Sequence, residues 1–226
     1  MNMANAQPPV IAIDGPSASG KGTVAQGVAK ALGFHWLNSG ALYRVVALAA
    51  LESKADLENE SKLSNIALNL KAKFVGDLVE IEGRDVTDAI RDEMVSLAAS
   101  RISSQAGVRK ALLKRQQAFR QPPGLVAEGR DMGSVVFPDS VLKIYLTASP
   151  EARAQRRYKQ LMDKGMDATM TALLQDIRAR DERDSNRATA PLKKATDAVL
   201  IDTTDLSAAD AVAQVVALYK KASRAL

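Results

Sequence analysis

Short apolar runs alternate with longer segments of helical pattern along most of the chain. Helical patterns begin near Lys21, Ala41 and Pro150, the last of them extending to residue 197. Strands separated by helices are typical of an α/β fold with a parallel sheet and right-handed crossovers. The five apolar runs, which have the length of buried strands, are residues 10–13, 34–38, 125–127, 141–146 and 198–202.

A different pattern fills the stretch between the second and third of these strands. Residues 73–75 turn at Gly76-Asp77 into residues 78–82, where apolar and charged positions alternate, and residues 83–86 follow. This predicts a small antiparallel sheet. Two helical patterns come next, at residues 90–102 and 108–120, and Pro122-Pro123-Gly124 ends them.

The same stretch is longer than a single crossover helix needs, which predicts an inserted subdomain. Its first part, residues 52–64, is polar and charged and predicts a solvated loop or a frayed helix. We therefore expect a core made of residues 8–64 and 121–226 and an insert made of residues 65–120.

Composition describes an ordinary globular protein. The 226 residues are 46% hydrophobic and 25% charged, which is enough for a core domain and a smaller insert. The absence of cysteine excludes disulfides and thiolate metal sites and suits a reducing cytoplasm. No apolar stretch approaches the ~20 residues of a membrane span, and residues 1–9 lack the features of a signal peptide. We expect a cytoplasmic protein with no membrane partner.

The formal net charge of +5 and the pI near 9.4 admit nucleic acid as a partner. However, aromatic residues make up only 4% of the chain, and the late arginines stand among acidic residues at helical spacing. Phosphorylated small molecules explain these arginines better than nucleic acid does, and we expect about half of them to be structural. They are Arg153, Arg156, Arg157, Arg178, Arg180, Arg183 and Arg187.

The sequence GPSASGKGT joins the first predicted strand to the first predicted helix, the context of a phosphate-binding loop. Glycines allow successive N–H groups to point at phosphate oxygens, and the start of the helix adds its unpaired N–H groups. We expect the Lys21 ammonium to face solvent until phosphates arrive, and the Thr23 hydroxyl to face Mg²⁺. The expected phosphate-binding residues are Gly15, Pro16, Ser17, Ala18, Ser19, Gly20, Lys21, Gly22 and Thr23.

Two alternatives to this interpretation stay open at this point. Gly22 stands where the strict motif has Ser or Thr, and a purely structural glycine turn is the simpler alternative. A regulatory protein that uses bound nucleotide as a switch is the other.

His35, the only histidine, stands beside Trp36 on a predicted strand, so we expect a packing or surface role for it.

Four motifs together resemble the bacterial-type cytidylate kinase family, phosphate-loop kinases of nucleoside monophosphates. They are the phosphate loop, LNSGALYR at residues 37–44, AEGRDMGSVVFP at residues 127–138, and RDERDSNRATAPL at residues 180–192. The resemblance implies a five-stranded parallel sheet with a central phosphate loop, a monophosphate-binding insert and a short helical lid at about residues 153–187. It also implies direct in-line phosphoryl transfer from ATP, with Mg²⁺, to CMP or dCMP without a general base. We expect a monomer.

Site residues carry over from the resemblance position by position. Lys21, Arg157 and Arg187 would act on the transferring phosphoryl group. The implied CMP-binding residues are Ser17, Ser39, Arg44, Ser100, Arg109, Arg130, Asp131, Arg180 and Asp184. Of these, Ser17, Arg44 and Arg130 would hold the acceptor phosphate, Ser100, Arg109 and Asp131 the cytosine, and Arg180 and Asp184 the pentose. The simpler alternatives are that Asp131 only pairs with Arg130 and that Ser100 is an ordinary helix serine.

Overall fold

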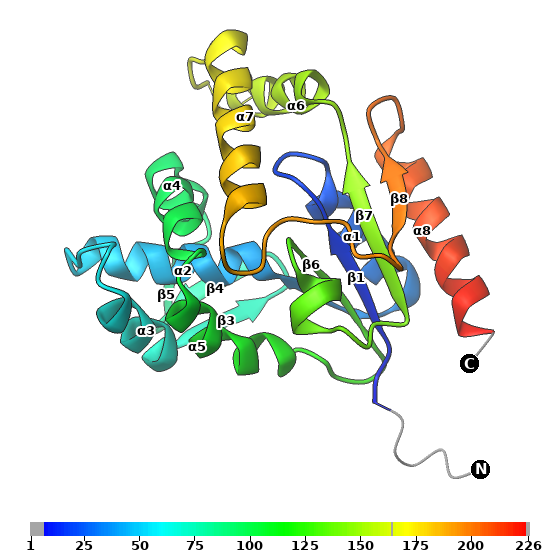
Figure 1. Cartoon of the computed structure of the whole chain (residues 1–226), viewed down its shortest axis with the longest axis horizontal. Coiled ribbons are helices and arrows are strands. Elements are labelled where there is room, and N and C mark those ends of the chain that lie inside the picture. Colours follow the sequence, from blue (N-terminus) through cyan, green and yellow to red (C-terminus); the bar gives the residue numbers. More distant parts are fainter. Residues whose placement is uncertain (1–6, 164, 225–226) are drawn as a thin grey trace. The chain divides into compact units, whose positions relative to one another are not determined.

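A computed structural model describes residues 7–163 and 165–224. Its main sheet has five strands in the order β2-β6-β1-β7-β8 (Figure 1). Strand β1 pairs in parallel with β6 and β7, and β7 pairs in parallel with β8. The predicted α/β fold with a parallel sheet is confirmed, and β1, which leads into the phosphate loop, lies at the centre. The strand bounds are β1 Val10–Asp14, β2 His35–Asn38, β6 Leu125–Gly129, β7 Leu142–Thr147 and β8 Val199–Asp202.

Helices α1 (Lys21–Leu32) and α8 (Ala208–Ser223) pack against each other beside this sheet. Their apolar faces and the buried strand residues form one core cluster. The contact is close, because a Cβ on Gly27 of α1 would lie 2.6 Å from a methyl group of Val212 on α8. This packing fixes α1, and therefore the end of the phosphate loop, on the sheet.

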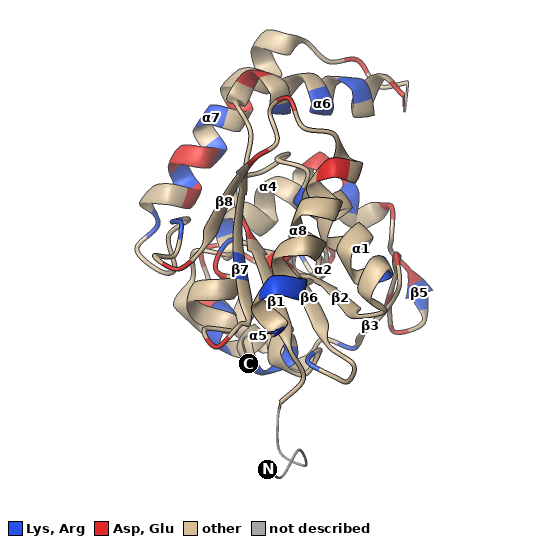
Figure 2. Cartoon of the chain, turned by 90° about the vertical axis from the view of Figure 1, so that its right-hand side faces the viewer, with Lys and Arg blue, Asp and Glu red and all other residues tan. Residues whose placement is uncertain are grey.

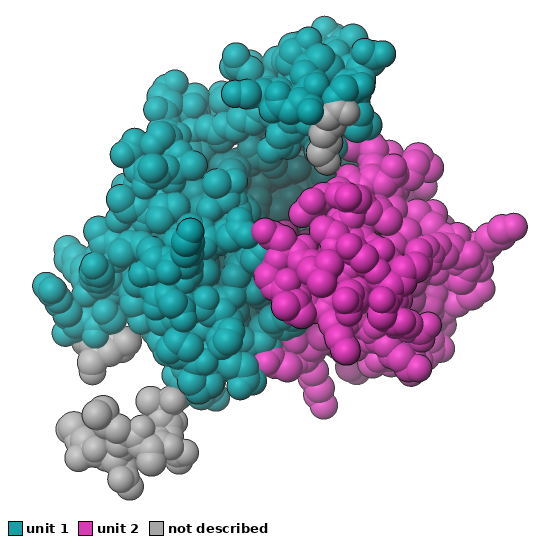
Figure 3. All heavy atoms as spheres, turned by 180° about the vertical axis from the view of Figure 1, so that it is seen from behind, with its two compact units in different colours: residues 1–37, 119–226 teal, residues 38–118 magenta. Residues whose placement is uncertain are grey.

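The chain divides into two compact units (Figure 3). Unit 1 comprises residues 1–37 and 119–226, of which 1–6, 164 and 225–226 lie outside the described residues, and unit 2 comprises residues 38–118. Within unit 2, strands β3, β4 and β5 form the predicted small antiparallel sheet. The elements of unit 2 are α2 Ser39–Glu52, α3 Glu60–Asn69, β3 Ala72–Val75, β4 Leu78–Ile81, β5 Arg84–Asp85, η2 Ala89–Arg91, α4 Glu93–Ile102 and α5 Ala106–Gln117.

Unit 2 differs from the predicted insert in two ways. It begins at residue 38 rather than 65, because α2 packs against α3, α4 and η2. A helix, α3, begins inside the stretch predicted to be a loop or frayed helix: Asn59 accepts a hydrogen bond from Lys62 N at 3.0 Å, and Leu63 is fully buried. The few apolar residues of this stretch therefore face one side of a helix, which its average polarity concealed.

Two packed helices make up the arginine-rich segment, α6 (Pro150–Met162) and α7 (Met170–Asn186). The Oγ atoms of Ser149 and Thr169 cap their first turns. Figure 2 shows basic residues on both helices, with acidic ones among them on α7. The helical pattern predicted up to residue 197 ends at Asn186, and the chain then runs without helix to β8. No helix in the described part of the chain is both long and apolar enough to cross a membrane.

Candidate functional site

The phosphate loop connects the last residue of β1 to the first residue of α1. Gly15 has φ 149°, and a Cβ there would lie 1.9 Å from the carbonyl oxygen of Leu146 in β7, so only glycine is compatible with this close approach. Gly20 caps α1 in the left-handed region, with φ 90°. The sheet and α1 thus hold a tight backbone turn whose N–H groups lie at a helix N-terminus, an anion-binding arrangement.

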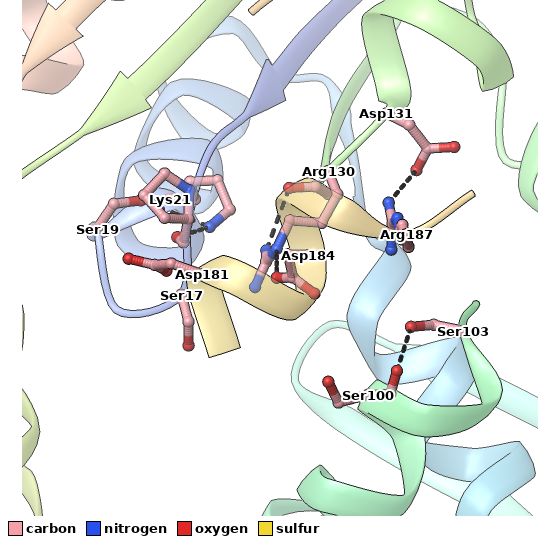
Figure 4. A network of polar contacts seen from close by, with 12 residues as sticks. Ser17, Ser19, Lys21, Ser100, Ser103, Arg130, Asp131, Asp181, Asp184 and Arg187 are labelled. Atoms are coloured by element: carbon pink, nitrogen blue, oxygen red, sulfur yellow. Dashed lines mark hydrogen bonds and ion pairs between the residues drawn. The ribbon is translucent and has the colours of Figure 1, made fainter. Parts of the chain in front are cut away.

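Lys21 does not face solvent, and the expectation that it would was wrong. Its side chain folds over its own loop, where Nζ donates to the carbonyl oxygen of Pro16 at 2.5 Å and lies 3.5 Å from Ser19 Oγ (Figure 4). Lys21 is only 6% exposed. Burial, and then the positive charge of Arg130, hold the pKa of Lys21 well below its usual range, while Glu128 opposes them. An anion bound beside this ammonium would relieve that cost.

The departure of Gly22 from the strict motif has a local explanation. A Cβ at this position would lie 3.3 Å from Oε1 of Glu128, a buried carboxylate near the end of β6. The Glu128 side chain therefore occupies the space into which a larger residue would extend. Thr23, in the same first turn of α1, is exposed.

The motif after β6 is held by an aspartate that the sequence did not single out. Asp14, the last residue of β1, accepts hydrogen bonds from Met132 N at 2.8 Å and Gly133 N at 2.9 Å. These residues begin a short π-helical segment, η3 (Met132–Val136). Burial raises the pKa of Asp14 to about 6, although the two N–H groups act to lower it. Asp14 thus joins the start of the phosphate loop to the Arg130-Asp131 segment.

Two ion pairs link this segment to α7 and the chain after it (Figure 4). Arg130 Nε donates to Asp184 Oδ2 at 2.7 Å, and Asp131 Oδ1 lies 4.0 Å from Arg187 Nη2. Burial acts to raise the pKa of Asp184, but Arg130 and the neighbouring arginines outweigh it and hold the pKa below its usual range. Four residues implied by the resemblance therefore meet within unit 1.

Two of the late arginines anchor α6. The buried Arg153 binds the carbonyl oxygens of Ala148 at 3.0 Å and Ser17 at 3.2 Å. It also forms a two-pronged ion pair with Asp181 of α7, at 2.9 and 2.5 Å. Arg156 donates to Thr203 Oγ1 at 3.1 Å and to its carbonyl oxygen. These two arginines are structural, and Arg157 and Arg180, which the resemblance placed at the substrates, are half-buried on α6 and α7.

The Arg153–Asp181 pair makes a testable contribution to stability. Asp181→Asn would leave the buried Arg153 guanidinium without a counter-charge, so we expect the free energy of unfolding in urea to fall by about 3 kcal/mol. The matched control is Glu151→Gln, which breaks an exposed pair with Arg178, 3.0 Å long, between the same two helices. That substitution should cost less than about 1 kcal/mol. Equal losses would contradict a structural role for Arg153.

Unit 2 carries the other implied CMP-binding residues. Ser39 Oγ donates to Gln116 Oε1 at 2.7 Å, and both residues are buried, so this hydroxyl also ties α2 to α5. Arg44 follows on α2 and is half-buried.

Ser100 and Arg109 are connected through one turn of chain in unit 2. Arg109 Nη1 donates to the carbonyl oxygen of Ser103 at 3.1 Å, and its guanidinium lies 5.9 Å from the centre of the Tyr43 ring. Ser103 Oγ in turn donates to the carbonyl oxygen of Ser100 (Figure 4). Ser100 Oγ is buried and has no hydrogen-bond partner among the described residues. A buried hydroxyl of this kind is costly unless a ligand satisfies it.

Comparisons of the sequence with a family model and with related proteins point to one family. A family model described as cytidylate kinase matches residues 11–221. The chain is 54% identical to a cytidylate kinase of Nitrosomonas europaea over 96% of this chain and 97% of that protein. It is 56% identical to one of Pseudomonas paraeruginosa over 90% and 91%, and 55% identical to one of Burkholderia pseudomallei over 94% and 93%.

Proposed function

The chain belongs to the cytidylate kinase family and is a kinase with CMP or dCMP as acceptor. We propose the following roles for its residues in binding the two substrates and in phosphoryl transfer. One observation carries the proposal. The segment that carries Arg130 is tied to the start of the phosphate loop that carries Lys21, because Asp14 at the end of β1 accepts hydrogen bonds from Met132 N at 2.8 Å and Gly133 N at 2.9 Å. The two motifs provide one cation in the donor loop and one outside it. This arrangement favours an enzyme that binds a donor and an acceptor phosphate over a protein that uses bound nucleotide as a switch.

The donor phosphates would bind the loop of residues 15–23, with their oxygens on its N–H groups and on Lys21. We propose that Mg²⁺ accompanies ATP and that Thr23 holds it, because its exposed hydroxyl stands in the first turn of α1 and Mg²⁺ prefers oxygen ligands. When bound, the ion would neutralise charge on the donor phosphates.

The proposed acceptor residues are those that the cytidylate kinase motifs imply. We propose that Ser17, Arg44 and Arg130 hold the CMP phosphate, because arginine forks match a dianion. Arg180 and Asp184 would contact the pentose, and Ser39 would contribute on the side of α2. Ser100, Arg109 and Asp131 would read the cytosine, and the unsatisfied hydroxyl of Ser100 supports that role.

Transfer would be direct and in line. The acceptor phosphate oxygen is already an anion at neutral pH, so no general base is needed. Lys21, Arg157 and Arg187 would stabilise the charge that spreads over the equatorial oxygens of the moving phosphoryl group. Catalysis then rests on alignment and charge stabilisation.

Replacing Arg130 with Lys should affect the acceptor more than the donor. Lysine keeps the charge but loses the fork that pairs with Asp184 and, in this proposal, with the CMP phosphate. We expect the KM for CMP to rise roughly tenfold and the KM for ATP to change much less, and Arg44→Lys to behave alike. Initial-rate measurements with each substrate varied would decide this, and equal effects on both KM values would contradict separate anion sites.

The function itself is tested by a coupled assay of ADP release with each nucleoside monophosphate in turn. CMP and dCMP should be the preferred acceptors, and a preference for another monophosphate would overturn the assignment. We further propose a cytoplasmic monomer that needs neither nucleic acid nor a membrane. Size-exclusion chromatography tests whether the protein is a monomer. DNA filter binding across a salt series tests whether it binds nucleic acid, since purely electrostatic association weakens as salt rises.

A further inference from the structure

Asp131 occupies the N-cap position of η3, yet its side chain makes no capping hydrogen bond. Aspartate at an N-cap ordinarily accepts from the N–H groups at the start of the segment that follows. In this protein the Asp131 carboxylate instead lies toward Arg187, with Oδ1 4.0 Å from Nη2 (Figure 4). Something else must therefore satisfy the N–H groups of η3.

Asp14 satisfies them from the neighbouring strand. Its two carboxylate oxygens each accept one N–H, from Met132 at 2.8 Å and from Gly133 at 2.9 Å. The approach is possible because β1 and β6 pair in parallel, with Asp14 opposite Gly129, just before Arg130 and Asp131. Asp14 thus performs the capping that Asp131 would perform in an isolated segment.

We propose that Asp14 is a positioning residue for acceptor specificity: by capping η3 it keeps the Asp131 carboxylate directed toward Arg187 and the nucleobase. The proposal rests on the proposed role of Asp131 in reading cytosine and adds the reason for its orientation. Without Asp14, the Asp131 carboxylate, as the N-cap residue of η3, could accept from Gly133 N. Turning inward to cap, it would turn away from the base.

The setting of Asp14 indicates that both of its carboxylate oxygens are needed. The residue is 8% exposed, and burial disfavours its charged form, so a buried carboxylate is a costly way to bind two amides. The titratable groups facing it are Lys21 from α1, Asp131 after β6 and Tyr145 from β7. A neutral cap would supply one acceptor oxygen, whereas the carboxylate supplies one for each N–H.

The test is Asp14→Asn, which keeps the shape but places an NH₂ group against one of the two N–H groups. We expect the ratio of kcat/KM for CMP to that for UMP to fall roughly tenfold, while the KM for ATP changes less than the KM for CMP. Ser207→Ala is the matched control, because it removes a cap in the same unit, at α8, where Ser207 Oγ accepts from Asp210 N at 3.1 Å. It should lower thermal stability without changing the CMP to UMP ratio.

Comparison with Asp131→Ala separates the positioning role of Asp14 from the base-reading role of Asp131. If Asp14 acts through Asp131, the double variant should show no smaller CMP to UMP ratio than Asp131→Ala alone. If Asp131→Ala lowers the ratio and Asp14→Asn does not, the inference about Asp14 is overturned and the base-reading role stands. If Asp131→Ala leaves the ratio unchanged, the base-reading role fails, and the inference fails with it.

A measurement on the unmodified protein covers the case in which Asp14→Asn does not fold. Protonation of Asp14, whose pKa is about 6, removes an acceptor just as the asparagine does. The ratio for CMP and UMP should therefore fall as the pH is lowered from 8 to 5. Titration of the substrate phosphate cancels in this ratio because both nucleotides carry the same group. A ratio that stays constant over this range would overturn the inference.

Discussion

Lys21→Ala is expected to lower kcat by ~10²- to 10³-fold, the usual cost of removing one charge-stabilising donor. The ammonium sits within the phosphate loop, bound to the carbonyl oxygen of Pro16 at 2.5 Å, and would exchange this contact for phosphate oxygens. Because burial and Arg130 both disfavour its charge, we expect the fold to tolerate the loss of this ammonium. The urea unfolding midpoint should therefore stay near that of the unmodified protein.

Lys30→Ala is the matched control, since Lys30 is an exposed residue in the last turn of the same helix, α1. It should leave kcat unchanged. Steady-state rates with saturating ATP and CMP, together with urea unfolding, make the comparison. Near-normal kcat in Lys21→Ala would show that the loop of residues 15–23 does not bind the donor as proposed.

The core of the fold could be predicted because its signals are local. Fully buried strands such as β1 and β6 begin with continuous apolar runs, and Gly15 and Gly20 mark the turn between β1 and α1. Helix α3 was predicted only as a solvated loop or a frayed helix, because its buried residues, Leu63 and Ala67, are few among polar neighbours and pack on a helix far along the chain. The start of unit 2 likewise depends on the packing of α2 against helices later in the chain. The local sequence pattern does not show which segments pack together.

Candidate site residues could be proposed from the sequence where they form contiguous motifs, but not where their role depends on distant partners. The motif AEGRDMG was enough to propose Arg130 and Asp131, but nothing near Asp14 in the sequence indicates that it caps that motif from the next strand. Asp181 looks like any acidic residue of a charged helix until Arg153 is placed beside it. The orientation of Lys21 likewise depends on the folded loop.

Asp131→Ala is expected to shrink the preference for CMP over UMP by roughly tenfold or more. Cytosine presents an amino donor at N4 and an acceptor at N3, whereas uracil presents an acceptor at O4 and a donor at N3. In the proposed site, Asp131 accepts from N4 and Arg109 donates to N3, a pairing that cytosine satisfies and uracil opposes. Asp131 is only 3% exposed, so a mismatched partner would not be compensated by water.

The size of the effect follows from that burial. Each buried group left without a suitable partner costs about 1 to 3 kcal/mol. UMP would meet two such mismatches, at Asp131 and at Arg109. Asp131→Ala removes one of them, so about half of the free energy that discriminates against UMP should be lost. Asp131→Ala should therefore lower kcat/KM for CMP strongly and for UMP much less. Asp139→Asn is the control, because Asp139 follows the same motif but pairs at the surface with Arg120, 2.7 Å away, and should leave the ratio unchanged. An unchanged ratio in Asp131→Ala itself would reduce the residue to a structural partner of the neighbouring arginines.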